Sequence, residues 1–374
     1  MKIRAAVLHA MGVPPPYSDS KPIAIETLEL DDPGQGEVLV KVAAAGLCHS
    51  DLSIVNGDRP RPLPMVIGHE AAGIVEKCGP GVDDLKKGDH VVLVFMPSCG
   101  RCVPCAEGRP ALCDPGLAAN IAGTLISGAR RLKRDGKYIN HQVGVSAFAE
   151  YAVVSRNSLV KVDPALPLDI AALFGCAVLT GMGAVVNAAR VTAGSTVAVV
   201  GLGGVGLSAV LGALAAGASR VVAVDILDHK LALARQLGAS DAFNGAAPDA
   251  VEKIRAVTGG GLEYVVETAG SAAAMDTAYK ITRRGGTTVT IGLPPPDAAL
   301  SVPLVQMVAE ERTVKGSYIG SCVPVRDLPR YIALYRQGNL PIDRLLTDRI
   351  KLDDINEGFE RLRRGDAVRQ VIVF

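Results

Sequence analysis

The sequence lacks an excess of charge of either sign. Its 39 Lys and Arg residues nearly balance its 38 Asp and Glu residues, for a formal net charge of +1 over 374 residues. The longest basic cluster, at 130–134, is most simply a solvated loop. A balanced surface offers no electrostatic attraction for nucleic acid or an anionic membrane. The composition therefore argues against both classes of partner.

Long apolar runs are also missing. The N-terminus, MKIRAAVLHAMGVPPPYSD, has too short an apolar run and too many prolines for a secretion signal, and no later run has eighteen apolar residues free of turn formers. We therefore expect a soluble, cytoplasmic protein whose eight cysteines stay reduced and available to metals. With 49% hydrophobic and 21% charged residues, the chain has enough apolar material for two folded domains.

The pattern of elements changes near residue 175. Before it, strand-like runs separated by Pro and Gly predict a mostly β domain, with strands at 37–43, 73–76 and 90–94. After it, strands and helices alternate, which predicts a doubly wound parallel sheet. The expected strands are 196–200, 220–224, 263–267 and 287–291, and the expected helices are 204–216, 229–237 and 272–283. A final strand at 371–374 suggests that the C-terminus returns to the first domain.

Four closely spaced cysteines indicate a metal site. Cys99, Cys102 and Cys105 recur every third residue in PSCGRCVPC, and Cys113 follows eight positions later. Four thiolates suit a tetrahedral zinc ion whose shell is filled by protein. The alternatives are disulfides or ordinary buried cysteines.

The segment GLGGVG at 201–206 follows an expected strand and begins an expected helix. In a dinucleotide-binding turn, Gly201 would allow the tight turn, Gly203 the approach of a pyrophosphate, and Gly206 close helix packing. Asp225 lies about twenty residues on, where an acid binds the ribose hydroxyls and repels a 2′-phosphate, which favours NAD over NADP. Asp225 could instead cap the helix that follows it.

Nearly the whole chain resembles the zinc-dependent medium-chain alcohol dehydrogenases. The motifs that carry the resemblance are, in order, GLCHSDL, GHEAAGIVEKCGPGV, the four-cysteine segment, GCAVLTGMGAVVN, GLGGVGLSAV and INEGFERLRRGDAVRQVIVF. The resemblance implies an α/β protein with a GroES-like, mostly β catalytic domain at 1–178 and 319–374, containing a structural zinc lobe at 97–115. It implies a Rossmann domain for NAD at 179–318, with the active site in the cleft between the domains, and the long segment 116–145 suggests a homodimer.

The resemblance also implies a catalytic zinc, and therefore two zinc ions per chain. Cys48, His69 and Cys176 match its ligands, and Glu70 is a nearby carboxylate able to enter the shell. Two thiolates and one imidazole leave one position open for an alcohol oxygen. Asp51 resembles the carboxylate that orients the histidine ligand.

Ser50 matches the hydroxyl through which family members pass the alcohol proton, although it could instead be a helix N-cap. Some members end this relay with a histidine three residues later, where this chain has Ser53. The proton must then leave through water, His49 or another route.

The remaining cofactor contacts are also implied by the resemblance. His49 and Arg369 match residues that face the cofactor phosphates, and Arg369 could alternatively be an exposed surface charge. Further residues expected at the cofactor are Gly204, Val205, Thr180 and Lys230, with Val205 and Thr180 at the nicotinamide end and Lys230 at the adenosine ribose.

Phe95 and Leu293 match positions that, with Ser50, line an apolar alcohol pocket in relatives. We therefore expect oxidation of a primary or aromatic alcohol to the aldehyde with NAD. The alternative within the family is S-(hydroxymethyl)glutathione (formaldehyde) dehydrogenase, but only Asp58 is acidic in GDRPRP, where that class carries two acids. A catalytically silent nucleotide-binding relative is disfavoured because all the expected metal ligands are retained.

Overall fold

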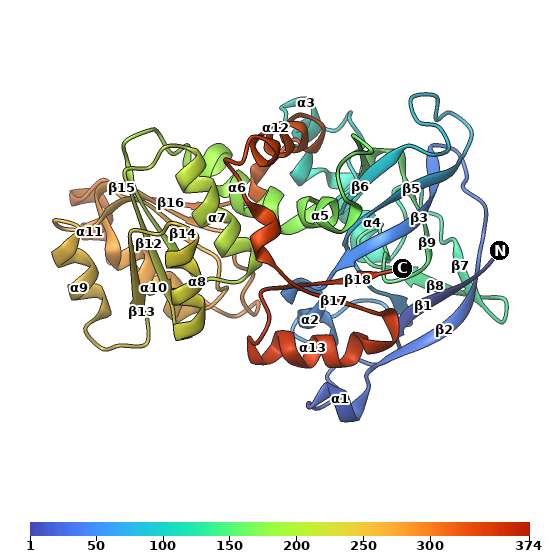
Figure 1. The fold of residues 1–374 in the computed structure, drawn as a ribbon, viewed down its shortest axis with the longest axis horizontal. Helices are drawn as coiled ribbons and strands as arrows, with labels where there is room; N and C mark the ends of the chain where they lie inside the picture. The colour runs from blue at the N-terminus through green and yellow to red at the C-terminus, as the bar shows by residue number, and fades with distance from the viewer. The chain divides into compact units, whose positions relative to one another are not determined.

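The computed structural model describes residues 1–374, which form two compact units (Figure 1). The first comprises Met1–Cys176, Val323–Pro329 and Leu346–Phe374, and the second comprises Ala177–Cys322 and Arg330–Leu345. Residues 177–178, 319–322 and 330–345, expected in the catalytic domain, pack with the second unit. The helix α12 (Pro324–Arg336) therefore contributes to both units, and its internal Pro329 marks the change.

The first unit is built from β-strands, as predicted. A closed barrel contains β1 (Lys2–Leu8), β2 (Ile23–Leu30), β7 (Leu132–Arg134), β8 (Lys137–His141) and β4 (Met65–Val66). A second sheet has the order β10 (Leu159–Val162), β6 (His90–Val94), β5 (Glu70–Cys78), β3 (Glu37–Gly46), β18 (Arg369–Val373) and β17 (Leu346–Ile350), and β9 (Tyr151–Ser155) also pairs with β3. Because β18 pairs with β3, the expected return of the C-terminus is confirmed.

Short helices connect these strands. They are α1 (Tyr17–Ser20), α2 (His49–Val55), α3 (Val103–Ala106), α4 (Asp114–Ala122), α5 (Leu168–Leu173) and α13 (Ile355–Arg364), with 3₁₀ turns at η1 (Pro110–Leu112), η2 (Arg156–Ser158) and η7 (Leu352–Asp354). The two that matter most for the site are α2, which follows β3, and α5, which continues into a π-helical segment η3 (Phe174–Val178).

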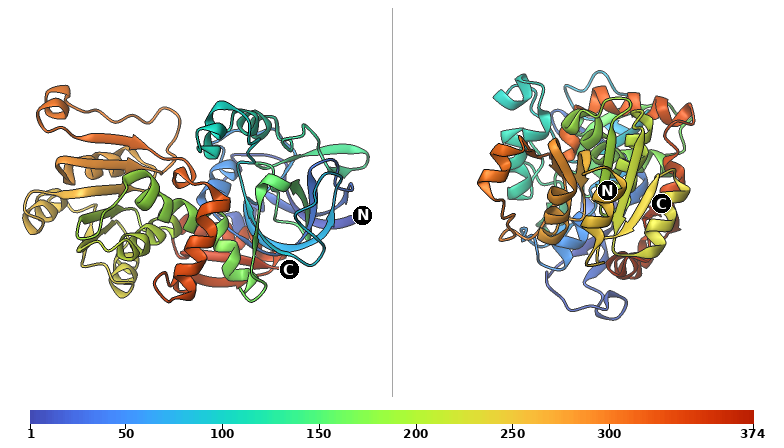
Figure 2. Two further views of the ribbon diagram at one scale, coloured as in Figure 1. Left: turned by 90° about the horizontal axis from the view of Figure 1, so that it is seen from above. Right: turned by 90° about the vertical axis from the view of Figure 1, so that its left-hand side faces the viewer.

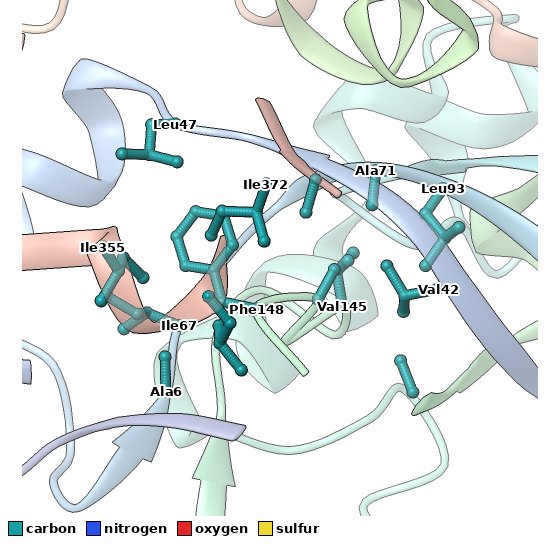
Figure 3. Close-up of a cluster of buried hydrophobic side chains, with 14 of the residues drawn as sticks. Ala6, Val42, Leu47, Ile67, Ala71, Leu93, Val145, Phe148, Ile355 and Ile372 are labelled. Atoms are coloured by element: carbon teal, nitrogen blue, oxygen red, sulfur yellow. The ribbon is translucent and has the colours of Figure 1, made fainter. Parts of the chain in front are cut away.

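The core of the first unit surrounds Phe148, which is fully buried and lies among Ala6, Ile67 and Ile372 (Figure 3). Its backbone N–H donates to the Ile67 carbonyl at 3.0 Å. Gly68 has φ +105°, and a methyl group there would lie 2.5 Å from the Phe148 nitrogen. Glycine is thus required at 68, and this close approach sets the backbone immediately before His69.

The second unit has one parallel sheet in the order β13 (Asp241–Asn244), β12 (Arg220–Asp225), β11 (Thr196–Val200), β14 (Leu262–Glu267), β15 (Thr282–Thr290) and β16 (Thr313–Gly316). Helices flank the sheet (Figure 2), namely α6 (Leu179–Gly183), α7 (Gly204–Ala215), α8 (Asp228–Gln236), α9 (Ala250–Val257), α10 (Ala272–Ile281) and α11 (Leu304–Ala309). The helical turns η4 (Ala184–Ala189), η5 (Ile319–Ser321) and η6 (Ile342–Leu345) complete it. The predicted strands and helices alternate as expected, and β13, α9, α11 and β16 are additional elements. The helix expected to reach residue 283 ends at Ile281, and β15 begins at Thr282.

One continuous helical stretch, Leu168–Ala189, is long and apolar enough to cross a membrane by length and composition. Its most apolar window is 89% buried inside the protein, as in the core helix of a globular fold. Gly175 lies within it, and a methyl group there would come 2.5 Å from the Leu93 carbonyl oxygen on β6. This close packing holds the π-helical turn that carries Cys176 against the sheet.

The buried His141 should make the protein sensitive to acid. Its Nε2 accepts the backbone N–H of Arg131 at 3.1 Å, and burial lowers the pKa of its imidazole to about 4. In the unfolded chain this imidazole has its ordinary pKa near 6.5 and binds a proton below that pH, whereas in the folded chain it stays neutral down to about pH 4. The free energy of unfolding therefore falls as the pH drops from about 6.5 to about 4. The shift corresponds to roughly 3 kcal/mol at the acid end.

We expect His141→Gln, which retains an acceptor for Arg131, to flatten this dependence. The check is the thermal unfolding midpoint of both proteins at pH 7 and pH 5. Parallel changes in the two midpoints would contradict the assignment.

Candidate metal centres and cofactor site

The four cysteines of the segment 97–115 form one cluster. All of them are free thiols, and the four sulfur atoms lie within 4.8 Å of one another. Backbone N–H groups point at them: those of Cys99 and Gly116 donate to Cys113 Sγ at 3.2 and 3.4 Å. The N–H of Arg101 lowers the pKa of the Cys99 thiol to about 6. Four converging sulfur atoms with N–H···S support fit a structural zinc ion.

A second cluster is assembled from distant parts of the chain. Cys48, His69, Glu70 and Cys176 are all buried, and their candidate ligand atoms lie within 4.8 Å of one another. Cys48 is at the turn between β3 and α2, Glu70 begins β5 with His69 directly before it, and Cys176 is in η3. The fold thus brings together the four residues that were predicted to surround the catalytic zinc.

The protonation pattern of this cluster suits a metal. Asp51 Oδ1 accepts the Nδ1–H of His69 at 2.6 Å, so Nε2 is the ring nitrogen left for the cluster, and Nε2 is buried without a hydrogen-bond partner. The Cys176 thiol donates to Cys48, which holds the pKa of Cys48 well below its ordinary value. Two cysteine sulfur atoms and an imidazole nitrogen without another partner are the donors expected for zinc.

Glu70 and Arg369 form an ion pair beside this cluster. Arg369 Nη2 lies 3.1 Å from Glu70 Oε2, and its Nη1 donates to the Leu47 carbonyl at 3.0 Å. Burial raises the pKa of Glu70 to about 7. The Arg369 side chain is almost completely buried, so the alternative of an exposed surface charge is wrong. Its contact with cofactor phosphate stays a prediction.

The first turn of α2 carries three of the predicted residues. The N-cap is Cys48, whose N–H donates to Asp51 Oδ2 at 3.1 Å, so the alternative in which Ser50 is the N-cap is wrong. Ser53 Oγ donates to the His49 carbonyl at 2.9 Å. The Ser53 hydroxyl is thus used within the helix, and the role of Ser50 in proton transfer stays a prediction.

Phe95 lies directly against the second cluster. Its ring meets the His69 ring edge-on, with centroids 5.0 Å apart and an interplanar angle of 86°. The ring covers the imidazole with apolar surface, as a wall of the expected alcohol pocket would.

In the second unit, the glycine-rich turn between β11 and α7 fits a dinucleotide. Gly201 has φ +92°, and a methyl group there would lie 2.7 Å from the Ala269 nitrogen. A methyl group at Gly203 would meet nothing within 4 Å, so this turn leaves open space where a pyrophosphate is expected. Gly206 packs against the Gly201 carbonyl. The turn therefore has both the tight backbone and the space that phosphate binding requires.

Asp225, at the end of β12, links this turn to the next one. Its Oδ2 accepts the N–H of Leu202 at 2.6 Å, and its Oδ1 accepts the N–H of Leu227 at 3.0 Å. Leu227 is the N-cap of α8, so Asp225 is not simply the cap of that helix. The contact of this carboxylate with a cofactor ribose stays a prediction.

The other predicted cofactor residues lie on neighbouring elements. Gly204 and Val205 begin α7, and Thr180 is buried in α6, where the adjacent Gly181 packs against the Val205 carbonyl. Lys230 is buried in the first turn of α8, whereas His49 on α2 and Leu293 after β15 are exposed.

One residue at the metal centre has no motif that points to it. Gln142 follows β8, is buried, and donates to Asp51 Oδ1 at 2.7 Å. It lies 91 positions from Asp51 along the chain, and a lone glutamine in HQVGVSAF resembles any other polar loop residue. Only an alignment of related sequences could have indicated it.

Comparisons with known proteins agree with this architecture. A family described as alcohol dehydrogenase GroES-like domain matches residues 34–164, and one described as zinc-binding dehydrogenase matches residues 204–337. The chain is 43% identical over 378 residues to an NDMA-dependent alcohol dehydrogenase of Amycolatopsis methanolica, covering 100% of this chain and 99% of that one.

Solved structures give the same result. An alcohol dehydrogenase zinc-binding domain protein from Burkholderia ambifaria is 36% identical with a TM-score of 0.94, and benzyl alcohol dehydrogenase from Acinetobacter calcoaceticus is 34% identical with a TM-score of 0.93; each comparison covers 100% of this chain and 99% of the other. The predicted fold class is thereby confirmed. The chain belongs to the zinc-dependent medium-chain alcohol dehydrogenase family.

Proposed function

We propose that this alcohol dehydrogenase oxidises primary or aromatic alcohols to aldehydes with NAD, using a catalytic zinc held by Cys48, His69 and Cys176. The observation that carries the proposal is the buried His69 Nε2, which has no hydrogen-bond partner and faces two cysteine sulfur atoms within 4.8 Å. The cysteine cluster of the segment 97–115 would hold a second, structural zinc.

When bound, the zinc supplies Lewis-acid stabilisation of negative charge on the alcohol oxygen, and the nicotinamide supplies a hydride acceptor. The protein's own residues prepare this site. Asp51 fixes the His69 tautomer, Phe95 excludes water on one side, and Ser50 Oγ accepts the alcohol proton and passes its own toward solvent. Glu70, neutralised by Arg369, lies within reach of the metal ligands.

The choice of NAD rests on Asp225. Its two oxygens already accept backbone N–H groups, which fixes the carboxylate at the edge of the glycine-rich turn. A fixed negative charge there accepts hydrogen bonds from ribose hydroxyls and repels a 2′-phosphate. Lys230, Thr180 and Val205 complete the proposed cofactor contacts, together with His49 and Arg369 at the phosphates.

The relative from Amycolatopsis methanolica supports a second candidate. That protein is described as NDMA-dependent and matches this chain over its full length at 43% identity. This chain would then pass electrons to NDMA rather than release NADH. The benzyl alcohol dehydrogenase neighbour supports the aromatic substrate in either case.

A turnover assay separates these candidates. The purified protein is given benzyl alcohol, hexanol or S-(hydroxymethyl)glutathione, with NAD, NADP or NDMA as acceptor, and its zinc content is measured on the same sample. We expect benzyl alcohol or hexanol to be oxidised with NAD and NADH absorbance to rise. Turnover with NDMA alone would favour the second candidate, and preference for the glutathione adduct or for NADP would contradict the proposal.

The proposed assembly is a homodimer through the second unit. Leu304, Val305 and Val308 on α11 are 77%, 75% and 78% exposed, and β16 is an edge strand with unpaired backbone groups. Exposed apolar helices and free strand edges are surfaces that a second copy can cover. Light scattering would give twice the chain mass; the mass of one chain would contradict the proposal. Location in the cytoplasm stays a prediction from the sequence.

A further inference from the structure

Gln142 connects Asp51 to the loop that carries His69. Its side chain is only 2% exposed, its Nε2 donates to Asp51 Oδ1 at 2.7 Å, and its Oε1 accepts the backbone N–H of Gly68. Gly68 directly precedes His69. The Gln142 amide therefore links the Asp51 carboxylate, which binds the His69 ring, to the backbone that carries His69.

The orientation of this amide follows from its partners. The Gly68 N–H can only donate, and an ionised Asp51 carboxylate can only accept. Gln142 therefore needs a donor and an acceptor at the end of the same side chain. Ionised glutamate of equal length lacks the donor, and methionine of similar shape has no donor and only a weakly accepting sulfur.

Asp51 is the shared support of two proposed metal ligands. Its Oδ1 accepts from His69 Nδ1 at 2.6 Å and from Gln142, while its Oδ2 accepts from the Cys48 N–H at 3.1 Å. The Gln142 bond is the one that reaches this carboxylate from outside the segments carrying the ligands. Without it, the carboxylate loses an external constraint on its rotation.

Gln142 is itself held by a fixed loop. Its backbone N–H donates to Ser146 Oγ at 2.9 Å, and that hydroxyl donates to the Val66 carbonyl at 2.8 Å. Val143 and Ser146 have φ values of +42° and +54°, which non-glycine residues keep only where the surrounding structure fixes them. The loop is thus anchored to the strand β4 that leads to His69.

We propose that Gln142 is a positioning residue of the catalytic metal centre: through Asp51 it keeps His69 and Cys48 oriented toward the metal. This inference rests on the proposed zinc at Cys48, His69 and Cys176. Loss of a group that supports a metal ligand typically weakens metal binding by 10- to 100-fold. Because Gln142 acts one residue further out, we expect about a tenfold effect.

The test measures how fast zinc passes from the intact protein to a chromogenic chelator. The proteins are the unaltered chain, Gln142→Glu and Gln142→Met, and Cys176→Ser identifies the release rate of the four-cysteine site. We expect both Gln142 variants to release the catalytic zinc about ten times faster, with no change at the four-cysteine site.

Gln142→Glu separates positioning from general stability. Glutamate can still accept from Gly68, so a merely structural role would leave its release rate close to that of the unaltered protein. Asn140→Leu is the matched control. The Asn140 amide donates to the Pro64 carbonyl and accepts from Arg130 Nε, both at 2.9 Å, and its loss loosens the same region without touching Asp51.

Slow release from Gln142→Glu, or equally fast release from Asn140→Leu, would overturn the role of Gln142 while the metal centre stands. Only one zinc per chain in the unaltered protein would overturn both proposals together.

Discussion

Replacing Cys176 with serine is expected to lower kcat/KM for benzyl alcohol by about three orders of magnitude while the protein stays folded. Cys176 provides one of the two sulfur atoms in the buried cluster that contains His69. The proposed metal would supply several kcal/mol of charge stabilisation during the reaction. A serine hydroxyl is a poor ligand for zinc, so the catalytic ion should be lost. The measurements are steady-state kinetics with the acceptor that supports turnover, zinc per chain, and the thermal midpoint.

The matched control is Cys78→Ser. Cys78 is half-buried and belongs to neither cluster, and its thiol donates to the Leu85 carbonyl at 3.4 Å, a bond that serine can also make. It should retain both zinc ions and ordinary activity. If Cys176→Ser loses one zinc but keeps kcat/KM within tenfold, Cys176 does not hold the catalytic ion.

Replacing Cys105 with serine should first cost stability. The four-cysteine cluster gathers the segment 97–115 around one ion, and the binding energy of a structural zinc is part of the folding energy. A loss of about 4 kcal/mol would lower the thermal midpoint by roughly 10 °C. Activity measured well below that midpoint should stay within a few fold of the parent, since no substrate can reach an ion whose four positions are filled by protein.

The comparison is the thermal midpoint of Cys105→Ser beside the parent and Cys78→Ser. Prolonged chelation of the parent should reproduce the same drop. A variant as heat-resistant as its parent would refute the structural role of this cluster. A large loss of activity at low temperature would show that the four-cysteine cluster also contributes to catalysis.

Local patterns in the sequence predicted much of the fold. The strands β6 (His90–Val94) and β11 (Thr196–Val200) have the predicted bounds, because a short apolar run bounded by turn residues is typical of a buried strand. The strand β13 and the helix α9 were missed. The four residues of β13 are only half-buried and carry little periodicity, so a sheet neighbour rather than the sequence makes them a strand.

The residues of the candidate site that belong to sequence motifs could be predicted. Metal-ligand residues must be Cys, His or a carboxylate, and phosphate turns need glycine, so these types stand out at fixed spacings. Gln142 and the partner of Arg369 had no such pattern. Arg369 was expected at cofactor phosphate, and its ion pair with Glu70 joins residues about 300 positions apart, which come together because β18 and β5 pair with opposite edges of β3.

The sequence by itself indicated the chemistry proposed for this protein, namely two sets of predicted zinc donors, a predicted dinucleotide turn and an acid at the end of the next strand. These depend on residue type and spacing, which the linear order states directly. The tertiary structure decided how the donors are supported: the close approach of Gly68 to Phe148, the bridge from Gln142 to Asp51, and the burial of Arg369 against Glu70. Such contacts depend on packing between distant segments, where any polar residue of suitable length would look the same in the sequence.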